Sequence, residues 1–162
     1  MAIEVREADP AEFAEAGAVT AAAYREFFDG TQWERYLDEI ADVASRAGRT
    51  EIIIALDAGA IIGSATLELD GRTSPDDGPL EPDRAHIRML GVHPDARGRG
   101  AAKALMTACE SRARAAGRTV LTLNTTDLMR AAKTMYEGLG YVRGPDEPLP
   151  GGITLLNYSK QL

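Results

Sequence analysis

A short stretch in the middle of the chain combines glycine, arginine and lysine in a spacing that suits a bound phosphate. It reads RGRGAAK over residues 97–103 and follows an apolar run, MLGV, at 89–92. Helical spacing begins at Ala101, so the expected order is strand, tight loop and helix. Glycines let the backbone approach a ligand, and free N–H groups at a helix N-terminus point at its negative charge. The arginines and the lysine add positive charge at the same place, so we expect an anion site here.

Two well-known phosphate loops do not fit this stretch. A GxxxxGK[ST] loop is absent, because alanine, alanine and lysine follow Gly100. A GxGxxG dinucleotide loop also fails, since the glycines at 98 and 100 are followed three residues later by Lys103 instead of a third glycine. The pattern that does fit is Arg-x-x-Gly-x-Ala over residues 97–102.

The elements that must position this loop are predicted from hydrophobic periodicity, caps and turn residues. Strands are expected at 3–6, 51–56, 61–69, 120–124, 141–142 and 153–158, and a central strand is expected to end at 92. Helices are expected at 10–27, 33–47, 101–115 and 128–139. This order predicts an α/β fold, in which a mixed sheet carries helices on both faces, and a single domain over residues 1–162.

Local signals mark several ends of these elements. Asp9 is expected to cap the first helix, with Pro10 at its first position. Residues 31–34, TQWE, are typical of a second capping box, and Gly48 is expected to end the helix that follows. The segment 72–84 holds three prolines and four acidic residues, which predicts an acidic loop.

Composition places the chain among globular proteins and narrows its partners. Of its 162 residues, 44% are hydrophobic and 27% are charged, values of a folded domain and not of a disordered chain. The net charge of −7 argues against non-specific nucleic-acid binding. The sequence shows no signal segment and no run of about 18 apolar residues, so we predict a cytoplasmic protein without a membrane partner. The one cysteine, Cys109, is expected in the core, and no metal site is predicted.

The Arg-x-x-Gly-x-Ala pattern resembles the pyrophosphate-binding signature of the GNAT-type N-acetyltransferases, which bind acetyl-coenzyme A (acetyl-CoA). The similarity extends upstream to Leu90-x-Val92-x-Pro94 and downstream to AAKTMYEGLGYV at 131–142. The resemblance implies the GNAT acyl-CoA N-acyltransferase fold. In that fold the central strand and the next strand splay apart, and coenzyme A (CoA) enters the gap between them.

The resemblance also implies which residues hold acetyl-CoA. The backbone N–H of Leu90 corresponds to the donor that faces the thioester oxygen, and Val92 to a contact with the pantetheine arm. Asn124 matches another polar position of the family, with a simple turn residue as the alternative. One departure is Met129, where the family usually has asparagine seven residues before its helix tyrosine. The residues expected to bind the cosubstrate are Leu90, Gly91, Val92, Arg97, Gly98, Arg99, Gly100, Ala101, Ala102, Asn124 and Tyr136.

Two side chains are candidates for proton transfer in such a reaction. Tyr136 corresponds to the family's helix tyrosine, whose phenol acts as general acid toward the departing sulfur; the alternative is an aromatic packing residue. His86 lies early in the central strand, near the position of a catalytic glutamate in some family members. An imidazole with a pKa near neutrality can accept the amine proton. Glu68, Glu81 and water are the alternatives for this base.

Two classes of function are compatible with these residues. The resemblance implies an acetyl-CoA-dependent N-acetyltransferase whose acceptor is a small-molecule amine or a protein or peptide, with a homodimer as an open possibility. The alternative is a non-catalytic acyl-CoA-binding or sensing module of the same fold, and a third hypothesis is an enzyme that uses a longer acyl group. The acceptor is expected near the two early helices. There, aromatic residues either line its site or pack in the core: Tyr24, Phe27, Phe28, Trp33 and Tyr36.

Overall fold

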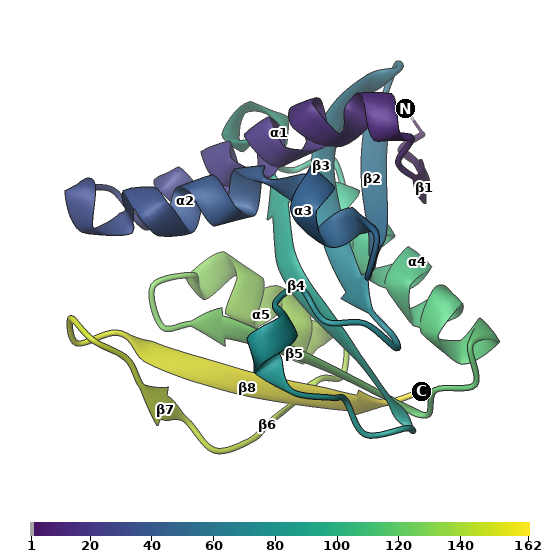
Figure 1. Cartoon of the computed structure of the whole chain (residues 1–162), viewed down its shortest axis with the longest axis vertical. Coiled ribbons are helices and arrows are strands. Elements are labelled where there is room, and N and C mark those ends of the chain that lie inside the picture. The colour runs from purple at the N-terminus through teal and green to yellow at the C-terminus, as the bar shows by residue number, and fades with distance from the viewer. Residues whose placement is uncertain (1) are drawn as a thin grey trace.

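The computed structural model describes residues 2–162, which form one mixed sheet with helices on both faces (Figure 1). The strand order is β1-β2-β3-β4-β5-β8-β6, and the short β7 pairs with β8. Over the described residues, every neighbouring pair is antiparallel except β4 and β5, which run parallel. The strands are β1 (Glu4–Glu7), β2 (Glu51–Asp57), β3 (Ala60–Glu68), β4 (Arg84–Val92), β5 (Val120–Thr126), β6 (Val142–Arg143), β7 (Glu147–Pro148) and β8 (Thr154–Gln161). The fold class expected from the sequence is confirmed.

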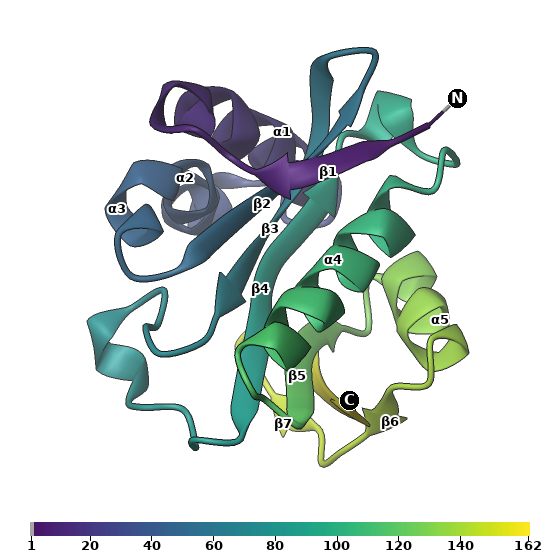
Figure 2. The same cartoon turned by 90° about the vertical axis from the view of Figure 1, so that its right-hand side faces the viewer.

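The helices divide between the two faces of the sheet (Figure 2). α1 (Phe13–Arg25), α2 (Glu34–Ala41) and α3 (Val43–Ala47) cover one side, here called the α1 face. α4 (Ala101–Ala115) and α5 (Arg130–Gly138) cover the other, the α4 face. The largest core lies on the α4 face and contains Cys109, as the sequence predicts. Burial raises the pKa of the Cys109 thiol to about 12, so this residue is a packing residue and not a nucleophile.

The start of α1 follows the predicted cap, whereas the region of α2 and α3 differs from the prediction. A 3₁₀ turn, Pro10–Glu12, precedes α1, and the Glu12 carboxylate accepts from the backbone N–H of Asp9 at 2.9 Å. Thr31 does not cap a helix but lies within a second 3₁₀ turn, Thr31–Trp33. The helix predicted over 33–47 is interrupted at Asp42, whose side chain accepts from Ser45 N–H at 3.3 Å and thereby starts α3 anew.

Strand β4 is the element that creates a gap in the sheet. It pairs with β5 only from Arg84 to Ile87, so its last five residues have a strand partner only on β3. In the pairing with β3, Met89 and Leu90 together oppose the single residue Ala65, and Met89 has a φ of 52°. This is a β-bulge, which bends the strand and shifts the alternation of its side chains. The bulge and the lost pairing together separate β4 from β5.

The bulge decides which side chains of β4 face which helices. Met89 packs with α1 and α2 residues, whereas Leu90 packs against the core of the α4 face. Gly91 returns to the α1 face, where a Cβ would lie 3.0 Å from the Cβ of Ala23. The missing side chain at Gly91 therefore lets α1 pack closely over the gap.

Candidate functional site

A pocket of about 460 Å³ lies where β4 and β5 separate. It is bordered by α1, the end of β4, the glycine loop and the segment that leads into α5. Because α1 covers one face of the sheet and α5 the other, the pocket reaches through the gap between the strands. Its walls are largely apolar, which suits a buried acyl chain with a few polar contacts. The lining residues are Ala23, Tyr24, Glu26, Phe27, Leu90, Gly91, Val92, Arg97, Gly98, Ala102, Leu128, Met129, Arg130, Ala131, Ala132 and Met135.

A second hollow of about 280 Å³ continues this pocket along the glycine loop. The two share four lining residues, Val92, Arg97, Gly98 and Ala102, so they form one groove. The groove runs from the N-terminus of α4 into the gap in the sheet. The structure therefore brings together most of the residues that the sequence predicts for the cosubstrate, from Leu90 to Ala102.

The glycine loop has the geometry of an anion site. Gly98 and Gly100 adopt φ values of 79° and 85°, which disfavour any other residue. A Cβ built at either glycine would meet no atom of the protein within 4 Å, so both face open space. Gly100 precedes the first residue of α4, and no side chain caps this helix end. The first N–H groups of α4 are therefore left for a ligand, and the helix dipole favours a negative one.

The charges of the loop are already partly compensated by carboxylates. The Arg97 guanidinium donates to Glu26 at the end of α1. The Arg99 guanidinium donates to the buried carboxylate of Asp57 at 2.9 Å. Lys103 forms no ion pair with any residue from 2 to 162. An incoming phosphate thus has to compete with Glu26 for Arg97.

Tyr136 lies behind the wall of the pocket, on α5. Its ring packs against Tyr141 and Tyr158 with centroids 6.0 and 6.2 Å apart, and the residue is 5% exposed. Within residues 2–162 its hydroxyl forms no hydrogen bond, although it lies close enough to Tyr24, which lines the pocket, to raise the pKa of that phenol. Burial raises the pKa of Tyr136 well above its usual range. The hydroxyl therefore stays protonated and has a free donor.

His86 and Asn124 are placed away from the pocket that Leu90 lines. Both border a third hollow, on the α1 face between β4, β5 and β8. The Asn124 side chain donates to Asn157, and His86 Nδ1 lies 2.6 Å from Thr122 Oγ1. The tertiary structure thus separates these two predicted residues from the glycine loop, and their roles stay predictions.

The environment of His86 keeps its imidazole neutral. Burial is the main cause and lowers its pKa to about 4, while the nearby Glu68 carboxylate acts in the opposite direction. Arg72 and Arg88 add to the lowering. Of the rival bases, Glu68 is fully buried and accepts from Arg72 at 3.0 Å, whereas Glu81 is exposed and pairs with Arg84. Neither carboxylate lines the pocket at the gap.

Sequence reasoning missed two contributors to this groove. Glu26 pairs with a residue 71 positions away, and no local pattern indicates such a partner. The segment from Leu128 to Ala132 lines the pocket as the entry to α5, with Met129 in place of the asparagine usual in the resembled family. Of the five aromatic residues considered for the acceptor, Tyr24 and Phe27 line the pocket. The other three pack against one another: Phe28, Trp33 and Tyr36.

Two further properties concern possible partners of the described chain. Among residues 2–162, no group of three or more histidine, cysteine, aspartate or glutamate side chains is arranged to hold a metal ion. Over the same residues, none of the helices has both the length and the apolar composition required to cross a bilayer.

Comparison with known proteins is consistent with this groove. The sequence model of the acetyltransferase (GNAT) family matches residues 17–141. Among curated proteins, none matches the chain.

Solved structures share the fold over nearly the whole chain. The structure of yncA from Salmonella typhimurium, which contains its cofactor acetyl-CoA, is 18% identical with a TM-score of 0.74, covering 100% of this chain and 95% of that one. A GCN5-related N-acetyltransferase from Rhodopseudomonas palustris is 24% identical with a TM-score of 0.73, covering 100% and 99%. A ribosomal-protein-alanine N-acetyltransferase from Brucella melitensis is 17% identical with a TM-score of 0.71, covering 98% and 99%.

Proposed function

Because this chain belongs to the acetyltransferase (GNAT) family, we propose that it is an N-acetyltransferase that transfers the acetyl group of acetyl-CoA to a primary amine. The observation that carries the proposal is the groove that runs from the open glycine loop into the gap between β4 and β5. One end of the groove offers helix N–H groups to an anion, and the other reaches through the sheet to α1. A long cosubstrate with phosphates at one end and a reactive group at the other fits such a groove.

The residues present fit acetyl-CoA at its phosphate end. Gly98 and Gly100 leave open space where any side chain would stand, and the N-terminus of α4 supplies N–H donors. Arg97 and Lys103 would balance the pyrophosphate charge. Val92 lines both parts of the groove and would contact the pantetheine arm. When bound there, acetyl-CoA supplies an activated acyl group, and a thioester needs no metal for transfer to an amine.

Leu90 would stabilise the negative charge that develops on the thioester oxygen. The end of β4 has lost its β5 partner, so backbone groups on that edge are free to bind a ligand. A backbone N–H held in a fixed strand is a preorganised donor of the oxyanion type. We assign this role to the N–H of Leu90, as the resemblance of the sequence implies.

Tyr136 would assist the departure of the sulfur. Its raised pKa means that the phenol holds its proton more tightly than a thiol does. The hydroxyl therefore acts mainly as a hydrogen-bond donor to the thiolate. The proton that the amine loses, carried by water, converts the thiolate to the free thiol that is released. This role distinguishes an enzyme from a module that only binds acyl-CoA.

His86 would accept the amine proton only through water. It lies four residues before Leu90 on an extended strand, a separation of about 13 Å, and borders a different hollow. With a pKa of about 4 the imidazole is a weak base at neutral pH. Water in the acceptor region is therefore the first recipient of the proton, and His86 is at most a later one.

Thermal melting and thiol release test this proposal together. A ligand at about 100 times its Kd stabilises the native state by about 2.7 kcal/mol, so acetyl-CoA should raise the Tm clearly. ATP, which has phosphates but no pantetheine arm, is the control. Free thiol should then appear with at least one member of a panel of primary amines. An unchanged Tm would refute the cosubstrate, and a raised Tm without thiol release from any amine would favour the binding module.

A further inference from the structure

Arg88 stands on the α1 face, two residues before Leu90. It pairs with Thr66 of β3, and the bulge that follows places Arg88 and Met89 on the same side of the sheet. Even fully extended, two residues span about 7 Å, and the bulge at Met89 makes the distance shorter. The backbone of Arg88 is thus close to the proposed reaction centre, and its side chain, which is 32% exposed, lies on the face opposite to α4.

Most of the hydrogen-bonding capacity of Arg88 is unused. Nη1 donates to Asp77 Oδ2 at 2.5 Å. Nε and Nη2 have no partner among residues 2–162, and neither is sealed from solvent. These two groups form one edge of the guanidinium, and that edge matches the two oxygens of a carboxylate.

Two neighbouring arginines on this face, Arg46 and Arg72, already have partners for most of their donors. Arg46 is 2% exposed, and its donors bind Thr66 Oγ1 and the backbone oxygens of Glu39, Ile40 and Asp42. Arg72 donates to Glu68 at 3.0 Å and to the backbone oxygen of Gly78. Of these three arginines, Arg88 alone keeps its Nε–Nη2 edge without a partner among residues 2–162.

Two phenols add further donors at this place. Tyr24 and Tyr36 come from α1 and α2, and Tyr24 also lines the pocket. Burial raises the pKa of both, and the positive charge of Arg88 is the largest influence in the opposite direction. The phenols therefore remain protonated at neutral pH and lie near the guanidinium, so they can donate to an anion that it holds.

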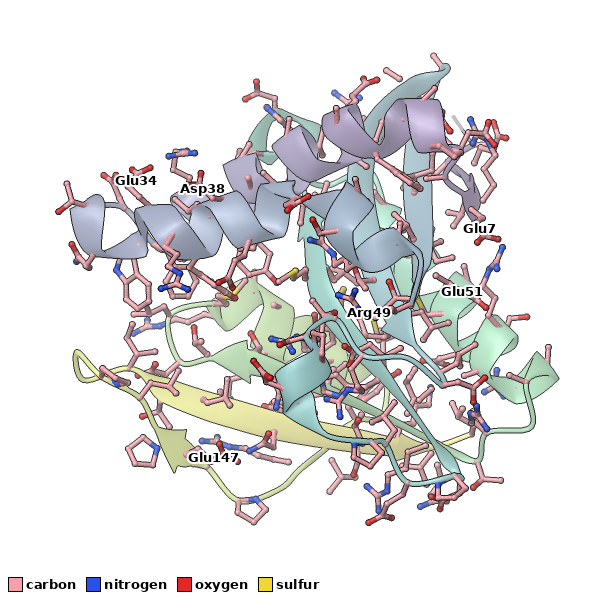
Figure 3. All side chains as sticks on the ribbon, viewed as in Figure 1. Glu7, Glu34, Asp38, Arg49, Glu51 and Glu147 are labelled. Atoms are coloured by element: carbon pink, nitrogen blue, oxygen red, sulfur yellow. The ribbon has the colours of Figure 1, made fainter. Side chains whose placement is uncertain are left out.

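The loop that carries Asp77 holds Arg88 in position. Arg49 donates to the backbone oxygens of Arg72 at 3.1 Å and Thr73 at 2.7 Å, and Figure 3 shows Arg49 between α3 and this loop. Asp77 ends the short 3₁₀ turn Pro75–Asp77 in the same loop. Asp77 binds Nη1, and the Nε–Nη2 edge of the guanidinium stays without a partner among residues 2–162.

We propose that Arg88 binds the carboxylate of the acyl acceptor, and that the acceptors are free amino acids with the amine next to the carboxylate. This inference rests on the proposed acetyl transfer and specifies its substrate class. The short backbone separation between Arg88 and Leu90 favours an acceptor whose anion and amine lie within a few bonds of each other. Tyr24 and Phe27 line the largely apolar pocket, and such walls suit an acceptor with an uncharged side chain.

Matched acceptors test the substrate class. Thiol release from acetyl-CoA is measured with the twenty protein L-amino acids, with their α-amides and with the corresponding carboxyl-free amines. A charge-assisted bidentate contact should give the amino acid about a 10- to 100-fold higher kcat/KM than its amide. The amide has the less basic amine, so a larger part of it is neutral and reactive. A preference for the amino acid therefore cannot arise from amine basicity.

Variants then assign the preference to Arg88. Arg88→Gln should bring the ratio between amino acid and amide close to one, and Arg88→Lys should restore part of it. Arg84→Gln is the control, since Arg84 lies on the same strand and face but four residues further from the gap, and pairs with Glu81. The rise in Tm with acetyl-CoA shows that each variant folds and binds the cosubstrate.

The outcomes separate this inference from the proposed function. Turnover of carboxyl-free amines or peptides but of no amino acid would overturn the inference and leave the acetyltransferase proposal intact. An unchanged selectivity ratio in Arg88→Gln would also overturn it. A protein that neither binds acetyl-CoA nor releases thiol with any acceptor would refute both proposals.

Discussion

The two sides of the gap between β4 and β5 offer a ligand different kinds of groups, backbone groups on the α4 side and side chains on the α1 side. On the α4 side, one continuous stretch, residues 97–103, provides an anion site made of backbone N–H groups and open space at two glycines. On the α1 side, the polar groups come from separate segments: Tyr24 of α1, Tyr36 of α2, Asp77 of the loop after β3, and Arg88 of β4. Each of them is held by side-chain contacts. A site made of backbone N–H groups can keep its ligand when the surrounding side chains differ. A site made of side chains can lose or change its ligand when one of those side chains is substituted.

Because of this difference, pH and backbone substitution should affect the two sides to different extents. The α4 side depends on two residues with positive φ and on the helix end that follows them. The α1 side depends on buried polar groups, among them His86 and Glu68, that are costly to charge or to leave without partners. We therefore expect pH to act on the α1 side and backbone substitution to act on the α4 side.

The largest expected effect is the pH dependence that His86 gives the fold. Its pKa is about 4 in the native protein and about 6.5 in the unfolded chain, so the unfolded state takes up a proton first as the pH falls. Stability is thus present above pH 6.5 and is lost between about pH 6.5 and pH 4, by about 3 kcal/mol. Denaturant titrations at pH 7.5 and pH 4.5 measure this loss.

Substitution of each histidine identifies the source of this loss. His86→Gln should remove most of the stability change between the two pH values. His93→Gln, at the other histidine of the chain, should keep it, because His93 lies in the partly exposed loop before 97–103. Glu12 has a lowered pKa of about 2, so its contribution to the stability of the fold is lost at pH values below this window. Equal pH dependence in His86→Gln and the native sequence would contradict the prediction.

The second effect is a loss of rate at Tyr136. Tyr136→Phe should lower kcat by about 10- to 100-fold, because it removes the hydrogen bond that the departing thiolate accepts, and leave the KM for acetyl-CoA nearly unchanged. Stability should hardly change, since within residues 2–162 the hydroxyl has no partner and the ring still packs. Steady-state kinetics and thermal melts measure both quantities.

Tyr141 supplies the opposite control from the same aromatic cluster. Its hydroxyl donates to Glu110 at 2.9 Å in the core. Tyr141→Phe should therefore cost about 1 kcal/mol of stability without a comparable loss of kcat. If kcat fell equally in both phenylalanine variants, Tyr136 would act through packing and not through the hydrogen bond of its hydroxyl.

The third effect tests the backbone character of the α4 side. Gly100→Ala places a methyl group where a phosphate would stand and should weaken acetyl-CoA binding by about 10-fold, or about 1.4 kcal/mol. Gly59→Ala is matched, because Gly59 has a φ of 84° against 85° for Gly100 and equally open surroundings, but lies in the β2–β3 turn. Calorimetric titration of both variants separates the backbone strain from the phosphate contact. Equal affinity in the two would show that the loop does not touch the ligand.

The smallest effect concerns the carboxylate that competes with phosphate. Glu26→Gln should release Arg97 and tighten acetyl-CoA binding by about 2- to 5-fold, since an exposed ion pair contributes up to about 1 kcal/mol. Added salt should reduce the gain. Glu34→Gln is the control, on the outer side of α2 with only a distant contact, 4.0 Å, to Arg25 (Figure 3). Weaker binding in Glu26→Gln would mean that Glu26 positions Arg97 and does not compete for it.

The sequence by itself determines the parts of this protein that depend on short-range physics. The glycines at 98 and 100, the helix that opens at Ala101 and the turn at 57–59 follow from local conformational preferences and caps. Periodicity over ten or fifteen residues likewise predicts the order of strands and helices, and hence the α/β class. Even here, one side-chain cap at Asp42 is enough to divide a predicted helix into α2 and α3.

Only the tertiary structure decides where the gap opens and what faces it. The pairing of β4 with β5 ends at Ile87 because of a register between segments more than thirty residues apart, and the bulge then directs Met89 to the α1 face and Leu90 to the α4 face. The same long-range geometry pairs Glu26 with Arg97. It also puts His86 and Asn124 at a different hollow, away from the pocket. Local propensity carries no information about such contacts, because they are set by packing between elements that meet only in the folded chain.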